Sequence, residues 1–180
     1  MTKLLEVLLC LAGSYVVFSW IEYSGHRWLL HKMRMANRLG SEYLRRMCTN
    51  HMKLHHGSDY EHKHHQKDDD PLQLTVAGMV VGFVGTLPLY LVYPFGAKVL
   101  VVVGILYALV MYFVHLEMHL RKGWFYARTP VYRYLERRHR LHHLHPNANY
   151  NVLLPLFDWL FGTGVKMTVS DVELAEATAH

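Results

Sequence analysis

The chain has 180 residues and a formal net charge of +5 at pH 7, and 15 of its residues are histidine. This length predicts a single domain over residues 1–180. The two cysteines, Cys10 and Cys48, are too few for a disulfide framework. The sequence has no basic-aromatic motif of the kind that binds nucleic acid, so its positive charge indicates membrane topology and contact with lipid headgroups.

Three long apolar stretches predict membrane-spanning helices. Residues 4–21 contain one charged residue, Glu6, and residues 72–97 and 99–114 contain none. A helix that crosses a bilayer needs roughly 20 mostly apolar residues, and the last stretch reaches that length only with its flanking residues. We therefore expect an all-α, integral membrane bundle of about three transmembrane helices rather than a soluble helical core. The first stretch also fits a signal peptide, but it runs directly on into His26, which favours a retained helix.

The basic residues predict the orientation of these helices. Of the 19 Lys and Arg, nine lie between Arg27 and Lys67 and eight between Arg121 and Lys166. Short basic loops stay in the cytoplasm, and a three-span bundle brings both segments to that side, where their helices would cap it. The N-terminus and the turn at 93–96 then face the opposite side. The expected location is the inner membrane of a bacterium, or the endoplasmic reticulum membrane of a eukaryotic cell.

The histidines gather in these cytoplasmic segments or at their borders with the apolar stretches. Four distant parts of the chain contribute to this layer, and each contributes at least two histidines. We predict ten of them as metal ligands: His26, His31, His51, His55, His56, His115, His119, His139, His142 and His143.

Helical geometry directs many of these histidines to one face. Thr129 is a favourable N-cap and Pro130 a favourable first helical residue. In the helix that they begin, His139, His142 and His143 continue an apolar stripe.

In residues 41–56, His51 and His55 likewise share one stripe. His56 is rotated by about 100° from His55, so it needs a neighbouring site or a local unwinding of the helix.

His115 and His119 are four residues apart and point the same way in a helix. His26 and His31 are five residues apart and diverge by about 140°, which predicts that they serve different metals.

Buried imidazoles in this number need a metal partner. A neutral imidazole has one donor and one acceptor, so ten converging histidines do not all satisfy one another. One ion takes about four to six ligands, which predicts two ions. Iron, zinc, copper and nickel all suit imidazole, so the ligand type leaves the metal open. A haem protein would place histidine pairs within the membrane, and a transporter would place polar ligands at mid-membrane, where residues 74–95 have no charged residue or histidine.

The spacing of the histidines resembles that of the fatty acid hydroxylase superfamily of integral membrane non-haem di-iron oxygenases. The matching boxes are H-x4-H at 26–31, H-x3-H-H at 51–56, H-x3-H at 115–119 and H-x2-H-H at 139–143. The segment NYNVLLPLFDWLFGT, residues 149–163, resembles the closing segment of that superfamily. The resemblance covers about residues 20–164 and leaves residues 165–180 as a C-terminal tail.

The resemblance implies O2-dependent oxidation of a C–H bond at two iron ions, with zinc as a substitute in purified protein. It implies no catalytic residue beyond the metal ligands. We expect hydroxylation of a lipid acyl chain within the bilayer; carotenoid ring hydroxylation and lipid or sterol desaturation are alternatives in the same superfamily. A non-catalytic metal-binding or metal-transport protein is the alternative from another class.

The sequence departs from commoner members in two ways. It has three clear apolar stretches where many members have four spans, and it has no cytochrome b5-like domain. We therefore expect a separate electron-donor protein of ferredoxin or cytochrome b5 type.

Four further histidines have less defined roles. His62, His64 and His65 fit a solvated basic loop better than contacts around the metal site or with headgroups. His145 is a candidate for a contact outside the metal ligands.

Acidic and aromatic residues near the boxes complete the prediction. Glu117 lies between His115 and His119 in sequence but on the far side of the helix, so we do not expect it to be a ligand. For Asp158, with Trp159 and Phe161, a position at the membrane interface is favoured over a role in orienting ligands.

Overall fold

The computed structural model describes residues 2–57, 71–166, 168 and 169, and the regular structure in these ranges is all helical. This confirms the predicted all-α class. The elements up to residue 57 are α1 (Lys3–Ser24), the π-helix η1 (Gly25–Leu30), α2 (Met33–Arg38), α3 (Glu42–Asn50) and the π-helix η2 (His51–His55). Those from residue 71 are α4 (Pro71–Val92), α5 (Pro94–Leu120), the 3-10 helix η3 (Phe125–Arg128), α6 (Pro130–Leu144) and α7 (Leu156–Leu160).

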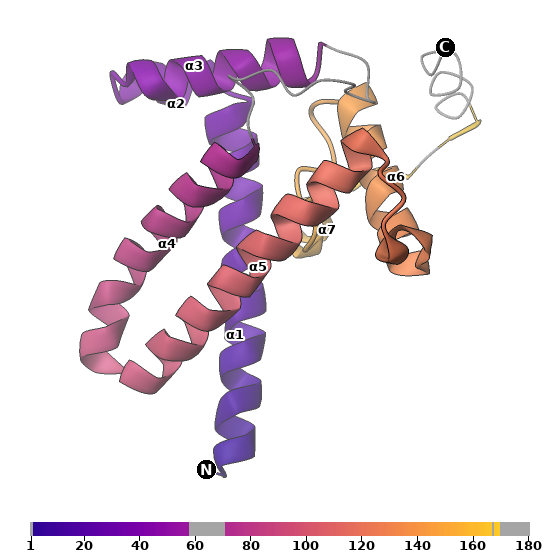
Figure 1. Cartoon of the computed structure of the whole chain (residues 1–180). Helices are drawn as coiled ribbons and strands as arrows, with labels where there is room; N and C mark the ends of the chain where they lie inside the picture. The colour runs from indigo at the N-terminus through magenta and orange to yellow at the C-terminus, as the bar shows by residue number, and fades with distance from the viewer. Residues whose placement is uncertain (1, 58–70, 167, 170–180) are drawn as a thin grey trace.

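The long helices α1, α4 and α5 form the body of the molecule (Figure 1). α4 and α5 make a hairpin, and α5 packs against α1. The hydroxyl of Tyr93, in the turn of the hairpin, donates to Glu6 Oε1 at 2.6 Å. The turn therefore lies at the N-terminal end of α1, whereas α2, α3, α6 and α7 gather toward the other end (Figure 1).

Among the described residues, two helices are long and apolar enough to cross a membrane, Lys3–Leu30 and Pro94–Leu120. Within the described residues, α4 contributes a shorter apolar stretch, Gly78–Val92. Large apolar side chains such as Leu8 and Leu91 are exposed on these helices, which suits a lipid environment because apolar surface there costs nothing to expose. The third span remains a prediction.

α1 and α5 cross closely at Gly104. A Cβ atom on Gly104 would lie 2.8 Å from Cζ of Phe18, which is too close for a normal contact. The Phe18 ring stacks on Tyr107, with ring centroids 5.3 Å apart. The absence of a side chain at Gly104 thus lets the two helices approach. The histidines at the C-terminal end of α5 and in η1, which follows α1, lie at the same end of the molecule.

Side-chain caps define where α6, which carries histidines, and α3, which leads into the histidines of η2, begin. Thr129 Oγ1 accepts a hydrogen bond from the Tyr132 N–H at 3.2 Å, and Pro130 is the first residue of α6, as predicted. Ser41 Oγ accepts from the Leu44 N–H at 3.3 Å at the start of α3.

Candidate metal centre

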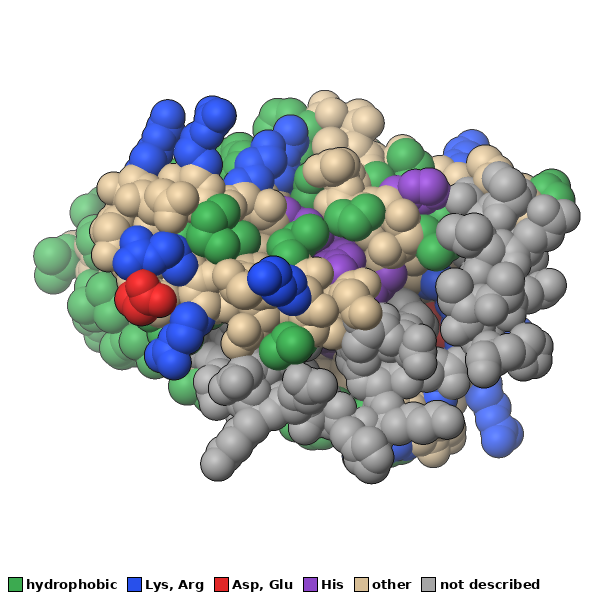
Figure 2. Space-filling view, turned by 90° about the horizontal axis from the view of Figure 1, so that it is seen from above, with side chains coloured by type: hydrophobic (Ala, Val, Ile, Leu, Met, Phe, Trp, Pro, Cys, Tyr) green, Lys and Arg blue, Asp and Glu red, His purple; other side chains and the backbone are tan. Residues whose placement is uncertain are grey.

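Nine of the ten predicted histidines form two groups whose nitrogens lie within 4.8 Å of one another. The five-histidine group contains His26, His31, His51, His56 and His142. The four-histidine group contains His55, His115, His119 and His139. Seen from above, histidine side chains show through the face built by the short helices, and Lys and Arg side chains are spread over that face (Figure 2).

The Nε2 atoms within each group converge. In the five-histidine group, His31 Nε2 lies 3.0 Å from His51 Nε2 and 3.0 Å from His142 Nε2. In the four-histidine group, His139 Nε2 lies 3.0 Å from His115 Nε2 and 2.9 Å from His119 Nε2. Two nitrogens bound about 2.1 Å from one ion at right angles are about 3.0 Å apart. The spacing in both groups therefore matches that of ligands around a common ion.

π-helical turns determine which histidines share a group. The His31 N–H donates to the His26 carbonyl at 3.1 Å, and the His56 N–H donates to the His51 carbonyl at 3.0 Å. Both are bonds to the fifth residue back, which widen the turn and align residues five apart. The prediction that His26 and His31 serve different metals is therefore wrong: their ring centroids are 4.9 Å apart in the same group.

The second π-helix also separates two adjacent histidines. His56 is aligned with His51 and joins the five-histidine group, whereas His55 joins the four-histidine group. The ring centroids of His51 and His55 are only 4.9 Å apart. The two groups are therefore neighbours, as a dinuclear centre requires.

His143 lies where the two groups meet. Its Nε2 is 3.1 Å from His55 Nε2, and its ring stacks on His56 with centroids 4.4 Å apart. All ten predicted histidines are thus gathered in one place.

Two histidines of the five-histidine group are held by backbone carbonyls. His26 Nδ1 donates to the Tyr150 carbonyl at 2.6 Å, and His142 Nδ1 donates to the Ala148 carbonyl at 2.7 Å. Because a carbonyl only accepts, Nδ1 carries the proton and Nε2 presents its lone pair. This is the usual arrangement of a histidine that binds metal through Nε2.

Burial keeps these imidazoles neutral. It lowers the pKa of His31 to about 2 and that of His56 to about 3, and nearby histidines add to the effect. Burial is also the main cause that lowers the pKa of His51, His139 and His142 well below the usual value. Neutral imidazole is the form that binds metal, so the environment favours the ligand state.

Asp158 is fully buried, so the interface position favoured by the sequence is wrong for this residue. Its carboxylate accepts hydrogen bonds from the backbone of Tyr150 and Asn151 and pairs with Arg138 at 2.8 Å. Trp159 remains 58% exposed, so the aromatic side chain next to it does face outward.

The acidic residue beside the third box has a local role. Glu117 is buried, and its carboxylate accepts from the Lys122 N–H at 3.0 Å and the Gly123 N–H at 2.8 Å. It therefore closes the turn after α5 and lies in neither histidine group, as expected.

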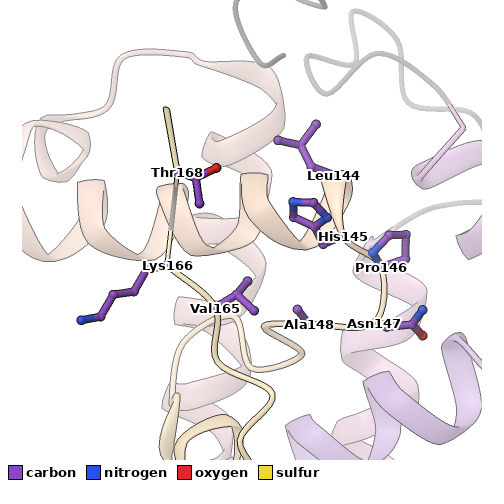
Figure 3. Close-up of a pocket in the computed structure, with 8 residues that line it drawn as sticks. All are labelled: Leu144, His145, Pro146, Asn147, Ala148, Val165, Lys166 and Thr168. Atoms are coloured by element: carbon purple, nitrogen blue, oxygen red, sulfur yellow. The ribbon is translucent and has the colours of Figure 1, made fainter. Parts of the chain in front are cut away.

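The remaining histidines lie away from both groups or outside the described residues. His145 ends α6 and lines a cavity of about 670 Å³ with Leu144, Ala148 and Val165 (Figure 3). The described residues around that cavity include none of the ten predicted ligands. His62, His64 and His65 lie outside the described residues.

Glu22, a partly buried acidic residue near the end of α1, was not predicted from the sequence to have a structural role. It accepts hydrogen bonds from the Leu153 N–H at 2.8 Å and the Leu154 N–H at 3.2 Å, and from the Val152 N–H. Asn151 donates its side-chain N–H both to this carboxylate, at 3.2 Å, and to the Ser19 carbonyl, at 2.9 Å. A carboxylate that ends an apolar stretch was the available signal in the sequence.

Apolar helices joined to a buried, all-histidine centre define a membrane protein of the histidine-box class. The chain belongs to the fatty acid hydroxylase family, whose model, described as fatty acid hydroxylase, matches residues 11–163. This confirms the resemblance on which the sequence analysis rested. Among curated proteins and among solved structures, none matches the chain at a significant level.

Proposed function

We propose that the chain is a membrane-bound non-haem di-iron oxygenase that hydroxylates a lipid acyl chain with O2. The observation that carries this proposal is the pair of adjacent, all-histidine groups. Membership of the fatty acid hydroxylase family supports iron as the metal, although imidazole nitrogen also suits zinc and copper.

The residues fit two ions. In this proposal the five-histidine group holds one iron, and the four-histidine group, with His143 at the junction, holds the second. Bound iron supplies activation of O2 and oxidation of an unactivated C–H bond. The protein supplies neutral Nε2 donors, and backbone carbonyls hold the Nδ1 protons of His26 and His142.

The position of the centre supports a lipid substrate. The histidines come from η1, which continues α1, from the C-terminal end of α5, and from η2 and α6 at the same end of the molecule. A chain lying along these apolar helices could therefore reach the metals without leaving the bilayer, and the helices would hold it in register. Electrons would come from a separate donor protein of ferredoxin or cytochrome b5 type.

The proposal is tested by lipid analysis of cells that express the protein under 18O2. Expression with a competent donor should add one labelled oxygen to an acyl chain, and a His139→Ala variant expressed at the same level should not. A labelled carotenoid ring, or a new double bond without label, would instead identify one of the other reactions of the superfamily. Absence of any oxidised product, with two irons bound and a donor present, would reject the enzyme in favour of a metal-binding protein.

A further inference from the structure

The loop between α6 and α7 supplies both carbonyls that hold histidines of the five-histidine group. Ala148 accepts from His142, and Tyr150 accepts from His26. Asn149, between them, adopts a left-handed conformation with φ of 51°, which asparagine tolerates better than most residues. The direction of the two carbonyls therefore depends on what holds this loop in its turn.

Asp158 holds the loop from within. Its Oδ1 accepts from the Tyr150 N–H at 3.0 Å, and its Oδ2 accepts from the Asn151 N–H at 2.8 Å. Thr163 Oγ1 donates to Oδ1 at 2.7 Å, and the Asn151 side chain accepts from the Asp158 N–H at 3.2 Å. A carboxylate is suited to this position because it accepts several hydrogen bonds at once.

Arg138 joins this arrangement to the metal-binding helix. Its guanidinium donates to Asp158 Oδ2 at 2.8 Å, and both side chains are buried. Arg138 lies one residue before His139 and four before His142 on α6. The ion pair thus connects the loop that supplies the carbonyls to the helix that supplies His142.

The hydrogen bonds from the loop reach the five-histidine group. The four-histidine group is carried instead by helical elements, with His115 and His119 on α5, His139 on α6 and His55 on η2. A change in the loop should therefore affect the two metal positions unequally.

We propose that Asp158 is a positioning residue for one of the two metals. Through the loop it directs the carbonyls that keep Nε2 of His26 and His142 aimed at the ion of the five-histidine group. This inference rests on the proposed two-metal function. Loss of an outer partner of a metal-binding histidine typically lowers metal affinity by about 10- to 100-fold, so removing the charge of Asp158 should weaken one metal by that factor and leave the other unchanged.

The test compares Asp158→Asn with Glu117→Gln in full-length protein loaded with zinc. Both variants convert a buried carboxylate that accepts two backbone N–H groups into an amide. Metal content and its release to a coloured chelator are measured. Asp158→Asn should release one of two zinc ions about 10- to 100-fold more readily, whereas Glu117→Gln should keep both as wild type does.

A double variant assigns the weakened position. Asp158→Asn should lower metal retention no further in a His142→Ala background, because both changes act on the same ion. Cobalt(II) loading gives a second readout. In Asp158→Asn, the visible absorption of cobalt should change only in the bands that His142→Ala also removes, and the remaining bands should stay as in wild type. If Asp158→Asn prevents folding, Thr163→Val removes one donor to the carboxylate and should weaken the same ion to a smaller degree.

Three outcomes would overturn the inference. The first is tight retention of both ions in Asp158→Asn, or in Thr163→Val where that variant replaces it. The second is equal weakening of both ions, and the third is the same behaviour in Glu117→Gln. Wild-type protein that never holds two ions would reject the proposed two-metal function itself, and the inference with it.

Discussion

A histidine that donates through Nδ1 has only Nε2 left for a metal, and His26 and His142 are both held in that form by carbonyls. Burial lowers the pKa of His142 well below its usual value, so the ring stays neutral. The histidine content and spacing were enough to predict which residues gather. The groups that hold these histidines could not be predicted in the same way. Tyr150 and Ala148 contribute backbone carbonyls, which every residue has, so the residue type gives no indication of this role.

Alanine substitution of any of the ten predicted ligands should lower metal content and activity, whereas alanine substitution of His145 should not. His139→Ala and His142→Ala each remove a converging nitrogen, so metal content should fall from two ions to about one. Product formation should fall by at least about 100-fold, since even an outer partner contributes up to that factor to metal binding. Elemental analysis and product assays on protein purified in mild detergent measure both effects.

His145→Ala is the matched control for these substitutions. His145 follows the same helix but lies in neither group, so both metal content and activity should stay at wild-type values. Equal loss of metal in all three variants would contradict the distinction between His145 and the ten predicted ligands.

At the scale of helices, predictions from the sequence were correct where the chain keeps the α-helical period of about 3.6 residues per turn. They were wrong where the chain forms a π-helix instead. Thr129 and Pro130 correctly marked the start of α6 because capping is local chemistry. The assignment of His26 and His31 to different metals failed because it assumed 100° per residue, and the structure has a π-helix there. The wider π-helical turn lets His26 and His31 converge with histidines from distant segments. The spacing of residues within one segment does not predict such a turn.

The close crossing of α1 and α5 predicts a penalty for any side chain at Gly104. Gly104→Val should destabilise the protein by about 1–3 kcal/mol, because the new atoms overlap the Phe18 ring. Gly82→Val, on α4 where a Cβ would meet nothing within 4 Å, is the matched control and should have little effect. Thermal unfolding in detergent measures both.

A second substitution checks the cause of that penalty. Phe18→Ala added to Gly104→Val should recover part of the lost stability, since it removes the ring that the valine meets. Equal melting temperatures for Gly104→Val and Gly82→Val would show that the crossing tolerates a side chain.

For the whole molecule, the all-α class, the family and the common location of the histidines could be predicted from the sequence. The hydrogen bonds that hold the loop between α6 and α7 to α1 could not. Glu22 accepts from Leu153, which lies 131 residues later, and both residues look ordinary in their own segments. Contacts between such distant positions depend on the packed fold and leave no local pattern.

The distribution of basic residues predicts that the histidine face lies in the cytoplasm. In a background without Cys10 and Cys48, a cysteine placed at the exposed Phe95 position should react with an impermeant thiol reagent on intact cells. A cysteine at Arg137, exposed on α6, should react only after the cells are opened. The reverse pattern would mean the opposite orientation.

The hydrogen bond from His26 to Tyr150 joins residues that are 124 positions apart, so during synthesis it forms only after the later residue has been added. Ribosomes add roughly 5–20 residues per second, so about 6–25 s separate the appearance of His26 from that of its partner. During that interval Glu22 has not yet met the backbone N–H groups that it binds in the finished protein. The five-histidine group is therefore completed only after residue 150 has been added, and a nascent chain that stalls shortly before it carries all four histidine boxes without the Tyr150 carbonyl that holds His26.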